Sequence, residues 1–241
     1  YQWKPQTDRT SEAAFDVIDF FCCGGGMSLG FASLKDYFHT LGGVDINSTS
    51  LKTYELNHGT PVLNADITTI SPKSNVIQQT FKLDSKRPLV IIGCAPCQGF
   101  SPHRKKDGDK PEDARNTLIG YFSDIAVNLN PDFVVMENVP EAVSYGEMNI
   151  PEIVCSSLSE HGYNAYWTVL NSADYGVPQV RERIIVVGIK QDLNKSVELP
   201  IPTNQCLDDY QTPISKRFES FKNYPYFKMP LLNENAPHWV T

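Results

Sequence analysis

The sequence predicts an α/β fold, in which a doubly wound, mostly parallel sheet carries helices on both faces. Apolar, β-rich runs recur along the first 190 residues, and helix-compatible stretches lie between them, as in βαβ units. Three consecutive glycines follow the first run, as expected where a strand turns sharply into a helix. The 241 residues, 41% hydrophobic and 11% aromatic, suffice for the core of one large domain of this class.

The runs that predict parallel strands are short, apolar and bounded by turn residues. They are FDVIDFF (15–21), LGGVDI (41–46), PVLNADI (61–67), RPLVIIGC (87–94) and DFVVMENV (132–139). Helices are expected near 48–58, 116–129 and 150–161. Two further β-rich runs, YNAYWTVLN (163–171) and RIIVVGI (183–189), are joined by a turn-rich link and predict an antiparallel hairpin at the sheet edge.

Composition shifts divide the chain into three parts. Residues 1–14 are a polar N-terminal extension, residues 15–190 are the predicted domain, and residues 191–241 are proline-studded without a clear period. The last part is expected to be irregular in structure and to be the start of a further region of the protein. The first residue is not Met, which we expect of a trimmed or processed chain.

Charge and cysteine usage narrow the functional classes. The formal charge of −7 counts against nucleic acid as a partner unless a basic segment is local, and HRKKDGDK (103–110) is such a segment. No apolar run approaches the roughly 20 residues of a membrane span, and the polar N-terminus lacks a signal-peptide core, so secretion is not expected. The six cysteines are unevenly spread in a large chain, which favours a reducing compartment over a disulfide scaffold.

The glycine-rich turn predicts a cofactor site. In DFFCCGGGMSLGF (19–31), a strand, a glycine turn and a helix start follow one another, and Asp45 ends the next strand. That offset of about 20 residues suits a carboxylate that meets ribose hydroxyls in dinucleotide-binding folds. Asp66 closes a third strand at the same edge. The glycines do not spell G-x-G-x-x-G, which leaves room for an adenosine cofactor other than a nicotinamide. The alternative is a tight turn without a ligand.

Two cysteines close the fourth strand in GCAPCQGFS (93–101). A zinc site would need a second ligand pair, which the other cysteines do not supply, so no metal is expected. A redox pair would leave the glycine turn and Asp45 without a role. Cys94 continues the apolar run and is expected to be buried and inert. Cys97 follows a proline at the mouth of the strand, where a helix-like N-terminus can lower the pKa of its thiol and favour the reactive thiolate.

A carboxylate and two arginines complete the candidate site. Glu137 in MENVP (136–140) follows an apolar strand directly, which predicts a partly desolvated carboxylate or, alternatively, a structural ion pair. In QVRER (179–183), Arg181 and Arg183 alternate and therefore project to the same side. They can bind phosphate or orient Glu137, and the alternative is an ordinary charged strand start.

In residues 15–190 the chain resembles the DNA (cytosine-5)-methyltransferase family. DFFCCGGGMSLGF resembles the family's S-adenosylmethionine-binding motif, GCAPCQGFS the Pro-Cys-Gln motif, ENVP the Glu-Asn-Val motif and QVRER the Gln-x-Arg-x-Arg motif. The resemblance implies a Rossmann-like fold that binds S-adenosyl-L-methionine. Cys23 stands where the family has a first glycine, and we expect the left-handed backbone position to shift to Gly24. The family's target-recognition region and two closing motifs are not found in residues 190–241.

The resemblance also implies roles for individual residues. Cys97 would be the nucleophile that adds to C6 of a flipped-out cytosine, with Glu137 at N3 and the exocyclic amine, held by Arg181 and Arg183. Residues 101–116 would be the mobile loop that closes over that base. The implied DNA-binding residues are Gln98, Ser101, His103, Arg104, Lys105, Lys106 and Asn138, of which Gln98 and Asn138 brace loops. The implied cofactor-binding residues are Phe21 and Ile46 beside adenine, Asp45 at the ribose, Asp66 at the adenine amine, Ile67 next to it, and Gly24, Gly25 and Gly26.

Three rival interpretations remain open. A redox or nicotinamide enzyme would give ENVP and QVRER no role. An RNA cytosine-5 methyltransferase stays within the family. The third is the catalytic half of a split or cleaved enzyme, or a binding-only subunit, with residues 191–241 as the start of a recognition region or as a subunit interface. The expected partners are double-stranded DNA and a second polypeptide, without a membrane. The expected location is the cytoplasm of a bacterium or archaeon, or a eukaryotic nucleus.

Overall fold

The computed structural model describes residues 14–96, 118–144, 148–205, 220–231, 233 and 235–239. Within them, residues 14–96 and 118–136 form one compact unit, and the described residues from 137 onward form a second. None of the helices in these ranges has the length and apolarity that a membrane crossing requires.

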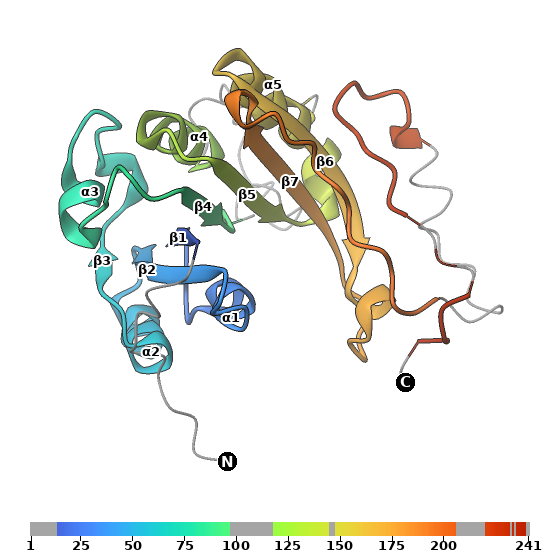
Figure 1. Cartoon of the computed structure of the whole chain (residues 1–241), viewed down its shortest axis with the longest axis horizontal. Helices are drawn as coiled ribbons and strands as arrows, with labels where there is room; N and C mark the ends of the chain where they lie inside the picture. The colour runs from blue at the N-terminus through green and yellow to red at the C-terminus, as the bar shows by residue number, and fades with distance from the viewer. Residues whose placement is uncertain are drawn as a thin grey trace, which may run out of the picture. The chain divides into compact units, whose positions relative to one another are not determined.

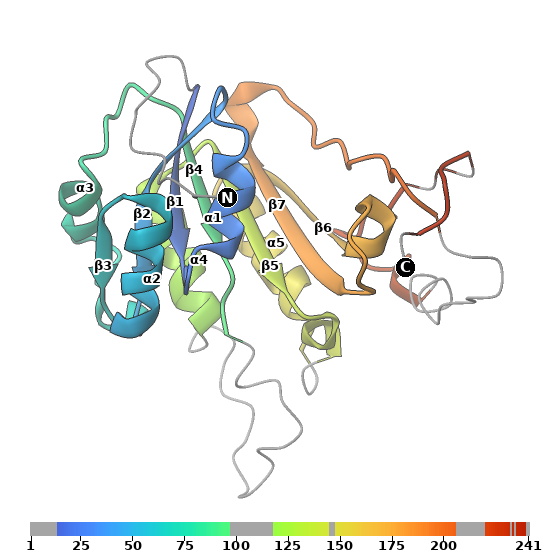
Figure 2. The same ribbon diagram turned by 90° about the horizontal axis from the view of Figure 1, so that it is seen from below.

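The first unit is built on parallel strands. They are β1 (Phe15–Phe20), β2 (Phe38–Asp45), β3 (Val62–Asn64), β4 (Leu89–Gly93) and β5 (Phe133–Asn138), of which β5 continues into the second unit. β1 pairs in parallel with β2 and β4, β2 with β3, and β4 with β5. Figure 2 shows β1, β4 and β5 running in the same direction. The carboxyl ends of these strands therefore meet at one edge.

Helices cover both faces of these strands, as predicted. They are α1 (Gly26–Ala32), α2 (Ser48–His58), α3 (Val76–Phe81) and α4 (Leu118–Leu129). α1 and α2 lie on one face and α4 on the other (Figure 1). Two neighbouring glycines of β2 face opposite helices. A Cβ added to Gly42 would lie 2.5 Å from Phe81 of α3, and one added to Gly43 would lie 2.9 Å from Tyr54 of α2. The doubly wound fold is thus confirmed, and α3 is an addition to the predicted helices.

The two central strands form the core of the first unit. Val17, Ile18 and Phe20 of β1 and Ile91 and Ile92 of β4 are completely buried. Side chains that point to opposite faces of a strand are both buried only where helices cover both faces. This explains why these strands appear in the sequence as continuous apolar runs rather than as alternating ones.

The second unit holds the predicted hairpin. β6 (Tyr163–Asn171) and β7 (Glu182–Lys190) pair antiparallel, from Tyr163 opposite Lys190 to Asn171 opposite Glu182. α5 (Ile150–Glu160) packs on the hairpin (Figure 1). The strand order of the sheet is β3-β2-β1-β4-β5-β7-β6, so the antiparallel pair is at the edge, as predicted.

The described residues beyond 190 have little regular structure, yet they pack closely. The chain at 226–228 runs along β6, since Trp167 N donates to Tyr226 O at 2.9 Å and Lys228 N donates to Trp167 O at 2.8 Å. Trp167 also packs against the rings of Phe221 and Phe227, with centroids 5.4 and 4.7 Å away. The backbone of the edge strand is therefore partly covered rather than open to pairing with another chain.

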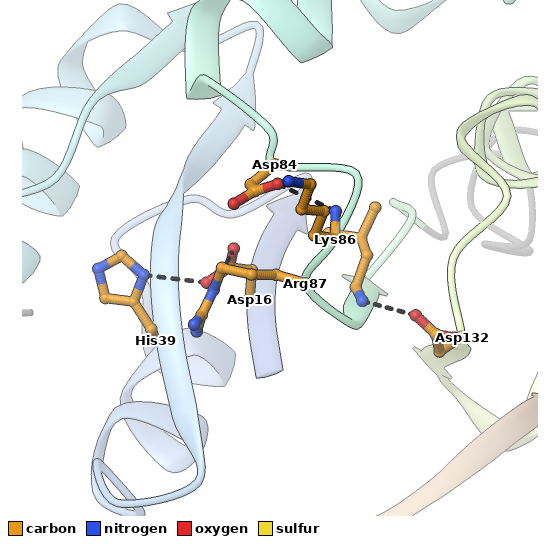
Figure 3. A network of polar contacts seen from close by, with 7 residues as sticks. Asp16, His39, Asp84, Lys86, Arg87 and Asp132 are labelled. Atoms are coloured by element: carbon orange, nitrogen blue, oxygen red, sulfur yellow. Dashed lines mark hydrogen bonds and ion pairs between the residues drawn. The ribbon is translucent and has the colours of Figure 1, made fainter. Parts of the chain in front are cut away.

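A polar network joins strand starts in the first unit (Figure 3). Asp16 of β1 is 2% exposed, and its carboxylate contacts His39 Nδ1 of β2 at 3.2 Å and Arg87 Nε, before β4, at 3.0 Å. Asp132 Oδ2 accepts a hydrogen bond from Leu89 N at 2.8 Å, which ties the start of β4 to the segment that leads into β5. These contacts lie at the amino ends of the strands, opposite the predicted cofactor edge.

Candidate functional site

The turn after β1 has a strained backbone. Phe21 and Cys23 have φ angles of 56° and 46°, in the left-handed region that side chains disfavour, and Gly25 has a φ of 90°. The predicted shift of the left-handed position to Gly24 is wrong, because Gly24 is absent from that region and Cys23 keeps it. The Cys23 N–H donates to Asp45 Oδ2 at 2.9 Å, which holds the strained residue in place. Gly25 is required as glycine, since an added Cβ would lie 2.1 Å from His58 Nε2.

Two carboxylates stand at the carboxyl edge of β2 and β3, as the sequence predicts. Asp45 accepts backbone hydrogen bonds from Cys23 N on Oδ2 and from Asn47 N on Oδ1, at 2.9 and 2.8 Å. Asp66 Oδ1 accepts from Thr68 N at 2.9 Å and thereby caps the 3-10 turn Ile67–Thr69. This turn is why β3 is shorter than the predicted strand. Each carboxylate oxygen has two lone pairs, so both groups retain acceptor capacity for hydroxyl or amine donors.

The predicted apolar contacts with adenine differ in exposure. Ile46 is 66% exposed just beyond β2, and its carbonyl accepts from Asn64 Nδ2 at 2.8 Å. Phe21 is half-buried, with its ring centroid 6.4 Å from that of Phe122. Ile67 is buried, so its side chain belongs to the core. An exposed apolar side chain beside two carboxylate acceptors fits an adenosine group, which offers a ring face, ribose hydroxyl donors and an amine donor.

A buried carboxylate below the turn was not predicted. Asp19 of β1 is 1% exposed, and Ser28 Oγ of α1 donates to its Oδ2 at 2.6 Å. Among the described residues its Oδ1 has no hydrogen-bond partner. Burial raises the pKa of Asp19 to about 7, although the Ser28 hydrogen bonds act in the opposite direction. The sequence signal was weak, because an acid in the middle of an apolar strand is the only hint of it.

The cysteine pair is only partly described. Cys94 is exposed, which makes the prediction of a buried, inert thiol wrong. β4 ends at Gly93, and beyond it Ala95 is the buried residue, so the chain leaves the sheet with Cys94 turned outward. Cys97 lies outside the described residues. So do the following predicted DNA-binding residues: Gln98, Ser101, His103, Arg104, Lys105 and Lys106.

In the second unit, Glu137 and Arg183 form an ion pair. Arg183 Nε lies 2.8 Å from Glu137 Oε1, and the side chains are 23% and 19% exposed. Arg183 Nη1 also donates to Glu182 O at 2.6 Å, which fixes the guanidinium at the start of β7. Such a partly buried, doubly held arginine can orient a carboxylate.

The other two predicted residues here take different places. Asn138 is 2% exposed, and its Oδ1 accepts from Val139 N at 2.8 Å, so its side chain braces the turn after β5. Arg181 is exposed just before β7, and its backbone N–H donates to Asn171 Oδ1 at 3.0 Å. Asn171 thus anchors the segment that carries the arginines, a role that the sequence did not indicate.

Comparison with known proteins identifies the family. The profile described as C-5 cytosine-specific DNA methylase matches residues 15–236. The chain belongs to this family. The match extends beyond residue 190, into the segment 191–241 that the sequence predicted to be irregular.

Individual relatives agree. The chain is 36% identical over 244 residues to M.OihORF3336P of Oceanobacillus iheyensis, a candidate type II methyltransferase, covering 94% of this chain and 52% of the relative. It is 33% identical over 197 residues to the type II methyltransferase M.AquIA of Picosynechococcus sp., covering 78% of this chain and 76% of that protein. A prophage-encoded Escherichia coli protein, solved as a candidate DNA modification methyltransferase, superposes with a TM-score of 0.63 at 28% identity, over 76% of this chain and 49% of that one. The chain spans about half the length of most of the curated relatives it matches.

Proposed function

We propose that this chain is the catalytic part of a DNA (cytosine-5)-methyltransferase, which methylates C5 of a flipped-out cytosine in double-stranded DNA. Membership of the family supports this proposal, and the observation that carries it is the ion pair between Glu137 and Arg183. A solvated charged strand start would not hold a glutamate and an arginine at 2.8 Å with both side chains mostly buried.

The cofactor of the proposed reaction is S-adenosyl-L-methionine, which supplies an electrophilic methyl group. Asp45 would accept hydrogen bonds from the ribose hydroxyls, and Asp66 would accept one from the adenine amine. Ile46 and Phe21 would lie against the adenine. Both carboxylates are held by backbone N–H groups, so they are fixed acceptors that lose little freedom when they bind.

The nucleophile of the proposed reaction is Cys97. Cytosine C5 attacks an electrophile poorly until a thiolate adds to C6, which makes C5 the carbon of an enamine. After the methyl group is transferred, the C5 proton leaves, the bond between Sγ and C6 breaks, and the thiolate is regenerated. The addition to C6 needs the thiolate form of Cys97, and a helix-like N-terminus after the proline would favour that form.

Glu137 would stabilise the base during this addition. Charge develops on the ring as the thiolate adds, and a carboxyl group at N3 and the exocyclic amine neutralises it. Arg183 holds Oε1 of this carboxylate at 2.8 Å, which leaves Oε2 for the base. The arginine would thereby orient Glu137, and Arg181 would contact the base or phosphate.

The base cannot react inside a stacked duplex, so the proposal includes base flipping, which requires a few kcal/mol. The basic residues 103–106 would contact phosphates while the loop that carries them closes over the base. Because the chain spans half of most relatives, a second polypeptide or a further part of the same protein would carry target recognition.

The test is a covalent adduct with DNA in which 5-fluorocytosine replaces cytosine, since fluorine cannot leave and traps the enzyme on the base. The chain is incubated with this DNA and S-adenosyl-L-methionine, and denaturing gels report the adduct. C97S should abolish it. C94S is the matched control and should retain it, because Cys94 is an exposed thiol three residues away.

The possible outcomes of this experiment distinguish a self-sufficient enzyme, an enzyme that needs a further part, and a failure of the proposal. An adduct from the chain alone supports a self-sufficient catalytic domain. An adduct that forms only when extract of the source organism is added supports a missing part that completes the enzyme. An adduct that survives C97S, or none under both conditions, overturns the proposal, and labelled methyl transfer to RNA then tests the RNA methyltransferase alternative.

A further inference from the structure

We propose that Asn57 and His58, at the end of α2, are positioning residues that set the shape of the glycine-rich turn for cofactor binding. This inference rests on the proposed function, because it assigns the turn to S-adenosyl-L-methionine. It concerns residues 33 positions away from the turn in sequence, on a helix that no motif marks as functional.

Two side-chain donors hold two consecutive carbonyls of the turn. Asn57 Nδ2 donates to Gly24 O at 2.9 Å, and His58 Nε2 lies 3.0 Å from Gly25 O. A carbonyl oxygen only accepts, so His58 must carry its hydrogen on Nε2 and donate. Two adjacent peptide planes are thereby fixed from the same helix, and with them the directions of the N–H groups that they carry.

His58 is itself fixed by a buried network. It is 4% exposed, and its ring lies against that of Tyr54, with centroids 4.6 Å apart. The Tyr54 hydroxyl is 2.8 Å from Ser28 Oγ, which in turn donates to Asp19. Burial lowers the pKa of His58, although the hydrogen bond to Gly25 acts in the opposite direction, so the imidazole is neutral near pH 7.

The glycine-rich turn packs tightly against α2 at Gly25 and has open space beside Gly26. A Cβ on Gly25 would lie 2.1 Å from His58 Nε2, whereas one on Gly26 would meet nothing within 4 Å. The start of α2 also reaches the turn, because Asp45 accepts from both Cys23 N and Asn47 N, the cap of this helix. α2 therefore holds the turn near both of its ends.

The hydrogen bonds from α2 stabilise a turn that contains a strained residue. Cys23 has a φ of 46° at the position where glycine would adopt that conformation without strain. Three hydrogen bonds, from Asn57, from His58 and to Asp45, hold the turn in this conformation. Without the α2 donors, we expect the turn to relax toward other backbone conformations and to bind the cofactor more weakly.

Four variants of the full chain test the inference. H58F keeps the ring against Tyr54 but removes the donor, and N57L keeps the size of the side chain but removes its donor. H58Q should restore function, because the Gln amide nitrogen can replace Nε2. E55Q, an exposed change on the same helix, is the matched control.

The measurements are the dissociation constant for S-adenosyl-L-methionine by calorimetry and the hydrogen exchange of the amides at 23–26 without cofactor. H58F and N57L should each weaken binding about tenfold, the equivalent of one hydrogen bond, and should speed amide exchange in the turn. H58Q and E55Q should stay within about twofold of the wild type. A role in stability alone would lower the melting temperature and leave the dissociation constant unchanged.

The inference and the proposed function fail in different ways. Wild-type protein that binds cofactor, together with H58F and N57L that bind equally well, overturns the positioning role. Wild-type protein that does not bind cofactor counts against the proposed function. In that case unchanged amide exchange in both variants still overturns the inference, and faster exchange still supports it.

Discussion

Replacing Arg87 by Met should destabilise the protein strongly, because it removes the guanidinium from the buried carboxylate of Asp16 and leaves only the contact with His39 (Figure 3). The side chain of Asp16 is 3% exposed and that of Arg87 25% exposed. Removing one partner of a buried ion pair costs about 3–5 kcal/mol. His39 Nδ1 remains 3.2 Å from Asp16 Oδ1, and water can reach the position that Arg87 vacates. We therefore expect R87M to lower the free energy of unfolding by about 2–3 kcal/mol.

The assay is thermal unfolding at pH 7, followed by circular dichroism. A loss of about 1 kcal/mol lowers the melting temperature of a chain of this size by roughly 2–4 °C, so R87M should melt about 5–10 °C lower. D16N/R87M removes the buried charge as well and should recover much of the loss. K86M is the matched control, because Lys86 is an exposed neighbour.

The ion pair between Asp16 and Arg87 should also make the stability of the protein depend on pH. Burial raises the pKa of Asp16, but hydrogen bonds and charge from His39 and Arg87 lower it further, so the net shift is downward. The pair therefore stabilises the protein above the unfolded pKa near 4, and this contribution is lost as the pH falls through the lower folded pKa. In R87M the loss should begin at a higher pH. R87M melting within 2 °C of the wild type, or D16N/R87M melting no higher than R87M, would refute this reasoning.

Three further predictions concern the candidate site. C23G should raise the free energy of unfolding by about 0.5–1 kcal/mol in urea, because glycine adopts the left-handed conformation without strain; a lower stability would contradict this assignment. R183Q should slow formation of the 5-fluorocytosine adduct by about 100-fold, since Glu137 loses the group that orients it, and an unchanged rate would remove Arg183 from the site. Burial raises the pKa of Asp19 to about 7, so its native state binds more protons than the unfolded chain between pH 4 and 7. Wild-type stability should therefore fall with rising pH in that window relative to D19N, by up to about 1.4 kcal/mol per pH unit, and parallel pH profiles would exclude a shifted Asp19.

Local sequence patterns predicted most regular elements, because their causes are local. The helix at 48–58 has the predicted bounds, since Asn47 caps its start and Gly59 ends it in the left-handed conformation. The strand at 163–171 is also as predicted, because β-rich residues fill it without a break. The short α3 was missed, because its six residues are too few for a helical period to be visible.

For the candidate site, the resemblance to the family implied that Arg183 holds Glu137, and the structure brings Arg183 Nε to 2.8 Å from Glu137 Oε1. The exposure of Cys94 was not predictable from an apolar run, because the run does not show where the chain leaves the sheet. Nor was the choice of Cys23 over Gly24 as the left-handed residue, which depends on a hydrogen bond to Asp45.

By itself, the sequence determined the fold class, the family motifs and the edge of the sheet where Asp45 and Asp66 lie, because the order of apolar runs and the spacing of motifs can be read directly from the chain. Only the tertiary structure decided which side chains support them. Arg87 meets Asp16 across 71 residues, and His58 meets Gly25 across 33. Such contacts depend on how helices and strands pack against one another, and no local period or propensity encodes that packing.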